Sequence, residues 1–381
     1  MNANPLRRLA ELDQSVWYDY IRRDLVEGGG LQRLIEGDGL AGMTSNPTIF
    51  QKAIAETELY DEDVRAHASR GLEPAAVFEA LAVEDVRNAA DVFRPLHEAS
   101  GGEHGFVSIE VGPHLARDTQ RTIEEARRLW KACDRPNVMV KIPGTAQGLP
   151  AIRQCLSEGI HINITLLFSV PRYREVMAQY FAALEERAGR GEPLGRIRSV
   201  ASFFVSRVDT NVDKKLDAHA KDASRPEADR KLARELRGKL AIANARIAYQ
   251  AFEETFRGPR WEALSAKGAA IQRPLWASTS TKDPAYPELY YVEALVAPRS
   301  VDTMPPETYE AYRERGEPKI RIREDLDGAQ AAFRGLQRLG IDEQQVSREL
   351  EDEGVRKFAD SYDQLLEAIG SKERALGVGR R

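Results

Sequence analysis

The chain has 381 residues, of which 42% are hydrophobic and 30% are charged, and its formal net charge is -5 at pH 7. These values are typical of a globular protein with ample apolar material for a core, and they argue against general disorder. Acidic and basic residues are interspersed, so we expect no basic surface that would attract nucleic acid or an anionic membrane.

Cysteine usage and the absence of long apolar runs favour a cytoplasmic protein. Cys133 and Cys155 fit no metal or redox spacing, so we expect free thiols or small buried side chains in a reducing compartment. The segment from Met1 to Asp13 lacks the apolar centre of a signal peptide. No apolar run approaches the length that a membrane span requires.

Short β-prone runs alternate with helical stretches along nearly the whole chain, which is typical of a parallel sheet covered by helices. The predicted strands are Val16–Tyr20, Leu40–Thr44, Phe106–Val111, Val138–Ile142, His161–Leu166, Val200–Phe204, Pro274–Thr279 and Ser300–Met304. Eight strands is the number found in α/β barrels, so we expect an α/β fold with a single (β/α)8 TIM barrel domain over residues 1–371.

Helical stretches with one charged face lie between these strands. The longest predicted helices are Pro74–Ser100, Asp118–Cys133, Pro171–Arg190 and Arg225–Phe256. Residues 207–273 form the longest excursion between strands and predict an inserted helical hairpin, with its turn at Asp222–Pro226. A smaller helical insertion is expected at Phe50–Ala68.

Further helices are expected after the eighth strand. Pro305-Pro306 opens one helix, and two charged amphipathic helices follow at Asp325–Leu339 and Glu343–Ile369, within residues 325–371. Residues 372–381 are basic and contain glycine, so we expect a disordered tail there.

Lys141 lies near the end of the fourth predicted strand, directly before a strand-terminating proline segment. It falls on the face opposite Val140 and Ile142, because side chains alternate along a strand. In an enclosed site, a desolvated lysine amine can attack a carbonyl carbon and form a Schiff base. The alternative is a lysine that extends to solvent.

Polar side chains alternate in the same way on the third and fifth strands. Ser108 and Glu110 oppose β-branched neighbours, and Asn163 and Thr165 share a face with His161. Strands covered by helices place their aliphatic face outward, so we expect these polar faces to converge inside the barrel.

Two carboxylates are expected near Lys141. Asp19 lies in the first strand and Glu110 in the third, and a structural salt bridge is the alternative role for each. Together the three residues suit covalent carbonyl chemistry, in which the lysine adds to the substrate and the carboxylates move protons.

The motifs at the strand ends resemble those of the transaldolase family. The matching segments are Met43-Thr-Ser-Asn-Pro-Thr48, Val107-Ser-Ile-Glu-Val111, Val140-Lys-Ile-Pro143, Asn163-Ile-Thr-Leu-Leu-Phe-Ser169, Ser202-Phe-Phe-Val-Ser-Arg207 and Trp276-Ala-Ser278. They occur in family order over about residues 14–305. The resemblance implies a barrel enzyme of the pentose phosphate pathway that works without a cofactor on sugar phosphates and forms a homodimer.

The resemblance also implies a reaction. A dihydroxyacetone unit would pass from sedoheptulose 7-phosphate or fructose 6-phosphate to glyceraldehyde 3-phosphate or erythrose 4-phosphate. Lys141 would form the Schiff base, and Asp19 would accept the hydroxyl proton during carbon–carbon cleavage. Glu110 would act through a water molecule held by Thr165.

The remaining matches are implied substrate contacts. Asn46, Asn163 and Ser202 match residues that bind the dihydroxyacetone fragment, and Arg207 and Ser278 match the phosphate end. Lys282 stands near the place of a family arginine, and either a phosphate contact or a solvated loop lysine fits it.

Phe204 distinguishes two activities within the resemblance. Fructose 6-phosphate aldolases have a tyrosine at the matching position, whose hydroxyl helps water to release the fragment. Phenylalanine lacks this hydroxyl, so transfer is favoured over simple cleavage. Cleavage of that kind and a phosphosugar-binding barrel without turnover are the alternatives.

No metal or nucleotide site is expected. The six histidines include no pair with metal-ligand spacing, and a lone interior His161 is more often a core residue than a ligand. The glycine runs at Gly28–Gly30 and Gly101–Gly102 lack the lysine and the spacing of nucleotide-binding loops.

Overall fold

Residues 4–378, which the computed structural model describes, contain eight parallel strands that close into a barrel. Each strand pairs with the next along the chain, and the last pairs with the first. The strands are β1 (Gln14–Tyr18), β2 (Gly42–Met43), β3 (Phe106–Glu110), β4 (Val138–Pro143), β5 (Ile162–Leu167), β6 (Ser199–Phe204), β7 (Gln272–Ala277) and β8 (Ser300–Met304). The predicted TIM barrel is therefore confirmed, with every strand end within two residues of its prediction.

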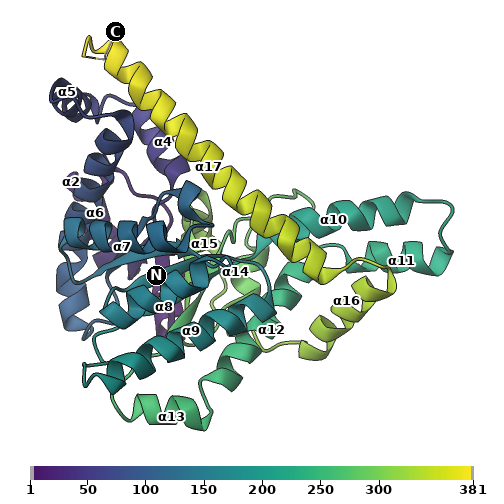
Figure 1. Ribbon diagram of the computed structural model, residues 1–381. Coiled ribbons are helices and arrows are strands. Elements are labelled where there is room, and N and C mark those ends of the chain that lie inside the picture. The colour runs from purple at the N-terminus through teal and green to yellow at the C-terminus, as the bar shows by residue number, and fades with distance from the viewer. Residues whose placement is uncertain (1–3, 379–381) are drawn as a thin grey trace.

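Helices surround this barrel (Figure 1). Those up to β5 are α1 (Pro5–Glu11), α2 (Arg23–Glu27), α3 (Gly30–Asp38), α4 (Pro47–Glu56), α5 (Asp61–Ser69), α6 (Pro74–Ala99), the 3-10 helix η1 (Pro113–Leu115), α7 (Thr119–Cys133) and α8 (Gly148–Glu158). The later ones are α9 (Val170–Gly189), α10 (Ser206–Lys221), α11 (Glu227–Leu236), α12 (Leu240–Thr255), α13 (Pro259–Ser265), α14 (Tyr290–Ala294), α15 (Pro306–Arg315), α16 (Leu326–Arg338) and α17 (Glu343–Ala375).

Side-chain caps explain where several of these helices begin. Asp118 accepts a hydrogen bond from the Arg121 amide at the start of α7, and Ser169 caps α9 in the same way. Asp325 accepts from the Gly328 amide and starts α16. Such caps satisfy amides that have no partner within the helix.

The single helix predicted over Arg225–Phe256 is wrong, because the chain breaks between α11 and α12. Gly238 has a φ of 75°, a left-handed conformation that a continuous helix cannot contain. Asp213 accepts a hydrogen bond from the Gly238 amide at 2.9 Å, and the Tyr290 hydroxyl donates to the Gly238 carbonyl oxygen at 3.0 Å. The predicted turn at Asp222–Pro226 does separate α10 from α11.

The C-terminal helix α17 continues beyond residue 372, where we expected the tail to begin. Lys372 donates to the Thr57 carbonyl oxygen at 2.5 Å and forms an ion pair with Asp61, which joins this end of α17 to α4 and α5. The expected tail therefore starts no earlier than the end of the helix at Ala375, and residues 379–381 lie outside the described part of the chain.

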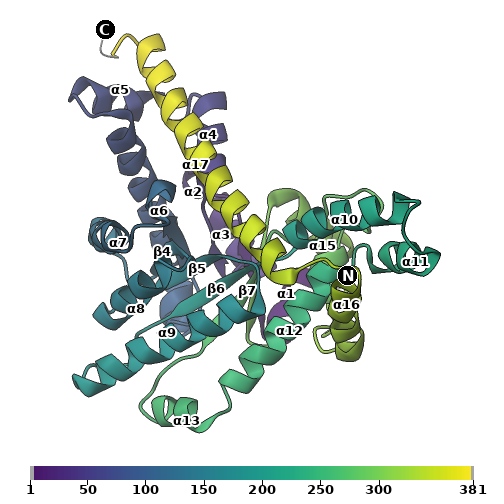
Figure 2. The ribbon, with the colours of Figure 1, turned by 45° about the vertical axis from the view of Figure 1, so that its right-hand side comes forward.

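The path of α17 is the feature of the fold that most affects the site. Figures 1 and 2 show it in yellow as one long helix running from α10 and α16 past α4 to the C-terminus. It contacts α4, α6, α10 and β5. The helix thus crosses the end of the barrel at which the parallel strands finish.

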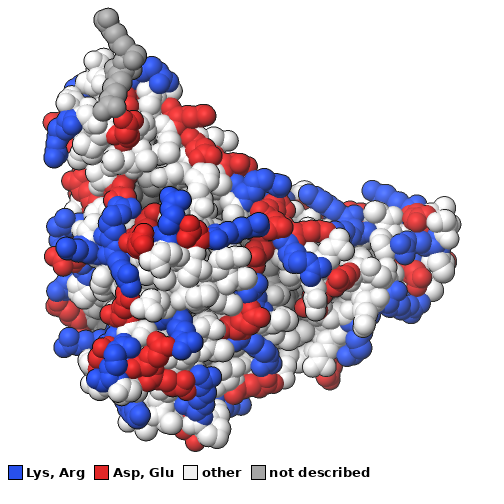
Figure 3. All heavy atoms as spheres, viewed as in Figure 1, with Lys and Arg blue, Asp and Glu red and all other residues white. Residues whose placement is uncertain are grey.

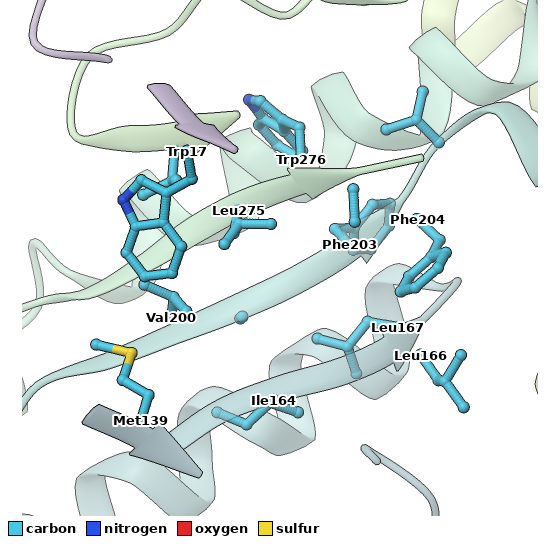
Figure 4. Packing of buried hydrophobic residues seen from close by; sticks show 14 of the residues in the cluster. Trp17, Met139, Ile164, Leu166, Leu167, Val200, Phe203, Phe204, Leu275 and Trp276 are labelled. Atoms are coloured by element: carbon cyan, nitrogen blue, oxygen red, sulfur yellow. The ribbon is translucent and has the colours of Figure 1, made fainter. Parts of the chain in front are cut away.

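An apolar layer fills the barrel below that end. Trp17, Met139, Val200 and Leu275 are buried there, as Figure 4 shows. Gly42 on β2 makes room for Trp17, because a Cβ at this position would lie 2.5 Å from the indole ring. This layer closes the barrel below the polar side chains at the strand ends.

The two cysteines are buried and free, as predicted. Burial raises the pKa of each thiol to about 12, so neither is a reactive thiolate at neutral pH. The face drawn in Figure 3 carries Lys and Arg side chains intermixed with Asp and Glu. Within residues 4–378, every helix is too short or too polar to traverse a bilayer.

Candidate active site

A cavity of about 470 Å³ opens at the C-terminal ends of the strands, a volume in the range that accommodates small metabolites. It is lined by most of the predicted site residues: Asp19, Asn46, Lys141, Thr165, Ser202, Phe204, Arg207, Ser278 and Lys282. Residues from β4, β5 and β6 and from the segments after β1, β2, β6 and β7 therefore meet at one place. This is the end of the barrel at which TIM-barrel enzymes hold their active sites.

Lys141 is buried at the end of β4, with 6% of its surface exposed. Its Nζ lies 3.4 Å from Oε2 of Glu110 and donates to the Ser45 carbonyl oxygen, also at 3.4 Å. Glu110 lies beside it on β3, where the register pairs the two residues directly. Burial raises the pKa of the Glu110 carboxyl, and the attraction of Lys141 opposes this shift. Glu110 is therefore placed to donate or accept a proton beside the lysine nitrogen.

Asp19 follows β1 and is held by hydroxyl and amide donors. Thr44 Oγ1 donates to its Oδ1 at 2.6 Å, and Asn46 Nδ2 lies 3.5 Å from the same oxygen. Thr44 also shares a hydrogen bond of 2.8 Å with Thr303 on β8. These donors keep the carboxylate oriented at the cavity wall, where it can accept a proton from a bound hydroxyl group.

A chain of hydrogen bonds runs through the buried residues of β3, β5 and β6. Ser202 Oγ donates to Asn163 Oδ1 at 2.6 Å, and Asn163 Nδ2 donates to Ser108 Oγ at 3.0 Å. Asn163 is fully buried and lies behind Ser202, which lines the cavity. Thr165 also lines the cavity, and its buried hydroxyl has no partner among the described residues. That hydroxyl can hold a water molecule or a substrate group.

Two cations gather at one end of the cavity. Arg207 lies in the first turn of α10, and its guanidinium carbon lies 5.0 Å from the centre of the Phe204 ring. No ion pair joins Arg207 to an acidic residue in the described part of the chain, and its buried Nη1 has no partner there. Burial lowers the pKa of the guanidinium. An anionic ligand would therefore supply the negatively charged partner that Arg207 lacks within the protein.

The loop after β7 brings Ser278 and Lys282 to the same end. Ser278 has a φ of 57°, which is uncommon for a residue with a side chain, and its hydroxyl lies 3.0 Å from that of Ser206. Lys282 is exposed at the cavity rim, with Nζ 2.6 Å from Ser280 Oγ. Although the residue is exposed, partial desolvation of its ammonium by surrounding protein atoms and the positive charge of the neighbouring Arg207 lower the pKa of Lys282.

Sequence reasoning missed several residues of the cavity. Thr44 lies within a motif used above, but the motif alone does not show that its hydroxyl binds Asp19. For Thr303, the only feature of the sequence that could have indicated a place in the site is its position near the end of the eighth strand. Phe358 comes from α17, and its ring lies 5.6 Å from Lys141 Nζ. An amphipathic helix pattern does not indicate which surface the helix will cover, so no signal identified Phe358.

Within residues 4–378 no group of three or more His, Cys, Asp or Glu side chains is arranged to hold a metal ion. His161 precedes β5, where Nε2 lies 3.1 Å from the Pro136 carbonyl oxygen. Burial lowers the pKa of this histidine to about 3, so it remains neutral as a core residue.

Comparison with known proteins links this geometry to one family. The family described as transaldolase/fructose-6-phosphate aldolase matches residues 16–369. A transaldolase of Frankia alni is 46% identical over 371 residues, which cover 97% of this chain and 98% of that protein. A transaldolase of Acidothermus cellulolyticus is 49% identical over 376 residues, covering 98% of each chain. A protein of Nostoc sp. named transaldolase 2 is 44% identical over 379 residues, covering 99% of each.

Proposed function

The chain belongs to the transaldolase/fructose-6-phosphate aldolase family, and from this premise we propose that it is a transaldolase that uses Lys141 as its Schiff-base residue. It transfers a dihydroxyacetone unit from a ketose phosphate to an aldose phosphate, as the pentose phosphate pathway requires. The observation that supports this best is the buried amine of Lys141, 3.4 Å from Glu110, in a cavity that Asp19 also lines.

The first stage is formation of the Schiff base. The Lys141 amine adds to the C2 carbonyl of the ketose, and the resulting carbinolamine loses water to give an imine that carries a proton on nitrogen. Glu110 supplies and removes the protons of this exchange, since burial raises its pKa and it contacts the amine. The free hydroxyl of Thr165 can hold the water molecule through which the proton passes.

The second stage is carbon–carbon cleavage. Asp19 takes the proton of the C4 hydroxyl, the C3–C4 bond breaks, and its electron pair moves to the cationic imine to form an enamine. The shortened aldose leaves. An acceptor aldose phosphate then binds, the enamine attacks its aldehyde carbon, Asp19 returns the proton to the new hydroxyl, and water releases the product. Thr44 and Asn46 donate hydrogen bonds to Asp19. They keep its carboxylate in position both to take the proton from the donor sugar and to return it to the product.

The two ends of the substrate are assigned by charge. Asn46 and Ser202 lie where they can contact the hydroxyls of the dihydroxyacetone fragment, and Asn163 orients Ser202 from behind. Arg207, Ser278 and Lys282 form the phosphate end. A guanidinium can hold a phosphate through two parallel hydrogen bonds, so Arg207 is the principal anchor.

Phe204 supports transfer over simple cleavage. Its ring lines the cavity and carries no hydroxyl that could activate water against the imine. With fructose 6-phosphate alone, little free dihydroxyacetone should accumulate, whereas adding erythrose 4-phosphate should produce sedoheptulose 7-phosphate. Steady release of dihydroxyacetone without an acceptor would favour the aldolase alternative. Binding without either product would favour a phosphosugar-binding barrel.

The Schiff base can be tested directly. Borohydride added with fructose 6-phosphate should attach a reduced three-carbon fragment to Lys141, as read by peptide mass spectrometry. Lys141→Ala should lose the adduct while its melting temperature and circular dichroism remain close to those of the native protein. Lys52→Ala removes another lysine of the same cavity and should retain the adduct. A folded protein that forms no adduct, or forms it elsewhere, would rule out Lys141.

Location and assembly are further proposals. We place the enzyme in the cytoplasm, in keeping with its two free buried cysteines. A homodimer stays a prediction, and light scattering of the purified chain would test it.

A further inference from the structure

The ring of Phe358 lies close to two of the cations that line the cavity, Lys141 and Arg207. Its centre is 5.6 Å from Lys141 Nζ and 5.9 Å from the guanidinium carbon of Arg207. The side chain lines the cavity and is 9% exposed. Phe358 reaches this place from α17, outside the barrel's own strands and strand-end loops.

The position of α17 is determined by close packing on the barrel. A Cβ at Gly354 would lie 2.9 Å from Cδ2 of Leu166, so glycine allows the helix to approach the end of β5. Polar contacts hold the helix on both sides of this point. Lys215 pairs with Glu349 at 2.8 Å, and Thr48 Oγ1 lies 3.0 Å from Ser361 Oγ. The ring therefore faces the cavity from a fixed helix.

Arg207 has aromatic rings beside it where a carboxylate would be usual. Phe204 and Phe358 both lie within 6 Å of the guanidinium carbon. Among acidic residues, Glu353 has the largest electrostatic effect on the pKa of Arg207, and Glu353 itself forms an ion pair with Lys357 at 2.5 Å. Aromatic faces attract a cation without neutralising it, so Arg207 keeps its charge for a phosphate.

Lys141 also benefits from an aromatic neighbour during the reaction. In the proposed reaction its nitrogen carries a positive charge after dehydration, as a protonated imine. A ring beside a desolvated cation stabilises it by electrostatic attraction to the ring face. Phe358 can therefore favour the protonated imine that forms before carbon–carbon cleavage and again after the enamine attacks the acceptor.

We propose that Phe358 is a positioning residue for the reaction, and this inference rests on the function proposed above. Its ring stabilises the protonated imine nitrogen of Lys141 and, together with Phe204, keeps Arg207 positioned for the substrate phosphate. The C-terminal helix thereby contributes a wall of the active site as well as packing the barrel.

The test compares variants that separate the charge of the ring face from its volume. Phe358→Leu keeps an apolar side chain without a ring, and pentafluorophenylalanine at position 358 keeps the shape but reverses the electrostatic potential of the face. Phe358→Tyr retains an attractive face. Tyr362→Leu is the matched control, since Tyr362 lies one turn along α17 and packs on Phe78, with its centre 5.7 Å from that ring.

Two readouts report on the two cations separately. Inhibition by inorganic phosphate reports on Arg207, and the fraction of enzyme trapped by borohydride at steady state reports on Lys141. Phe358→Leu and the fluorinated variant should each weaken phosphate inhibition by about five- to tenfold and lower the trapped fraction, the size expected for loss of one desolvated cation–ring contact. Phe358→Tyr should stay within about twofold of the native enzyme on the same scale. Tyr362→Leu should lower the melting temperature but leave both readouts unchanged.

Several results would overturn the inference. Native phosphate inhibition and trapping in the fluorinated variant would mean that the ring only fills space. Equal losses in Phe358→Tyr and Phe358→Leu would also exclude the ring face as the cause. If the native enzyme forms no borohydride adduct, the proposed function fails, but phosphate inhibition or phosphate binding by calorimetry still tests the effect of Phe358 on Arg207.

Discussion

Replacement of Arg207 by methionine should increase stability while it damages substrate binding. The guanidinium is partly buried, its buried Nη1 has no partner among the described residues, and desolvation lowers its pKa. A buried cation without a carboxylate costs several kcal/mol of desolvation, and the rings of Phe204 and Phe358 recover only part of that. Methionine is unbranched, apolar and polarisable, although shorter than arginine, and it suits a site between two rings.

The expected magnitudes follow from these contacts. A hydrogen bond to a charged group contributes about 1.5–3 kcal/mol, so loss of two bonds from Arg207 to phosphate removes about 3–6 kcal/mol. That corresponds to a fall of about 10²- to 10⁴-fold in kcat/KM for fructose 6-phosphate. Removal of the unpaired cation should add about 1 kcal/mol to the unfolding free energy and raise the melting temperature by about 1–3 °C.

Both effects can be measured on the same preparations. A coupled assay with erythrose 4-phosphate as acceptor gives kcat/KM, and differential scanning calorimetry gives the melting temperature. Lys282→Met is the matched control, because Lys282 is exposed and already contacts Ser280 at 2.6 Å. It should cost less activity and bring no thermal gain. An Arg207→Met enzyme with native kcat/KM, or with a clearly lower melting temperature, would refute the reasoning.

Three further changes test other groups. Glu110→Gln should lower kcat by about 10²- to 10⁴-fold, and a native rate would remove Glu110 from proton transfer. Phe204→Tyr should increase the dihydroxyacetone released without acceptor, as measured by NMR, and an unchanged yield would contradict the role given to the missing hydroxyl. Asp302 is fully buried on β8 and burial raises its pKa from 3.8 to about 8, so the folded chain keeps a proton that the unfolded chain loses. Stability should therefore fall as pH rises between about 4 and 8, and Asp302→Asn should flatten this fall in calorimetric melting temperatures; the same slope in both proteins would contradict it.

The strand pattern made the barrel and much of its interior predictable. Alternation along a strand assigned Glu110, Lys141 and Asn163 to inward faces, and the register pairs Glu110 with Lys141 and Lys141 with Asn163. Because all strands of the barrel are parallel, their C-terminal ends lie at the same end of the barrel. Polar side chains that point inward near those ends therefore lie close together. Alternation of polar and apolar residues was sufficient to assign the inward face of these strands, because helices cover the outer face of the barrel.

Helix breaks and helix placement were not predictable in this way. The pattern over Arg225–Phe256 is helical throughout, yet Gly238 turns the chain because Asp213 and Tyr290 bind its backbone from distant parts of the sequence. Likewise, Phe358 belongs to an ordinary amphipathic pattern. Its role depends on the contact between Gly354 and Leu166, which only the folded chain defines.

The alternation of polar and apolar residues also does not predict how deep a side chain lies within the barrel. Asn163 and Ser202 were both expected to touch the substrate, but Asn163 is fully buried and Ser202 lines the cavity. Asn163 accepts from Ser202 at 2.6 Å and donates to Ser108 at 3.0 Å, so its side chain is largely satisfied by protein. Its influence on the substrate therefore passes mainly through the orientation of the Ser202 hydroxyl. An alternating pattern selects the face on which a side chain lies, whereas the stagger of strands around a closed barrel decides which of those side chains reaches the cavity.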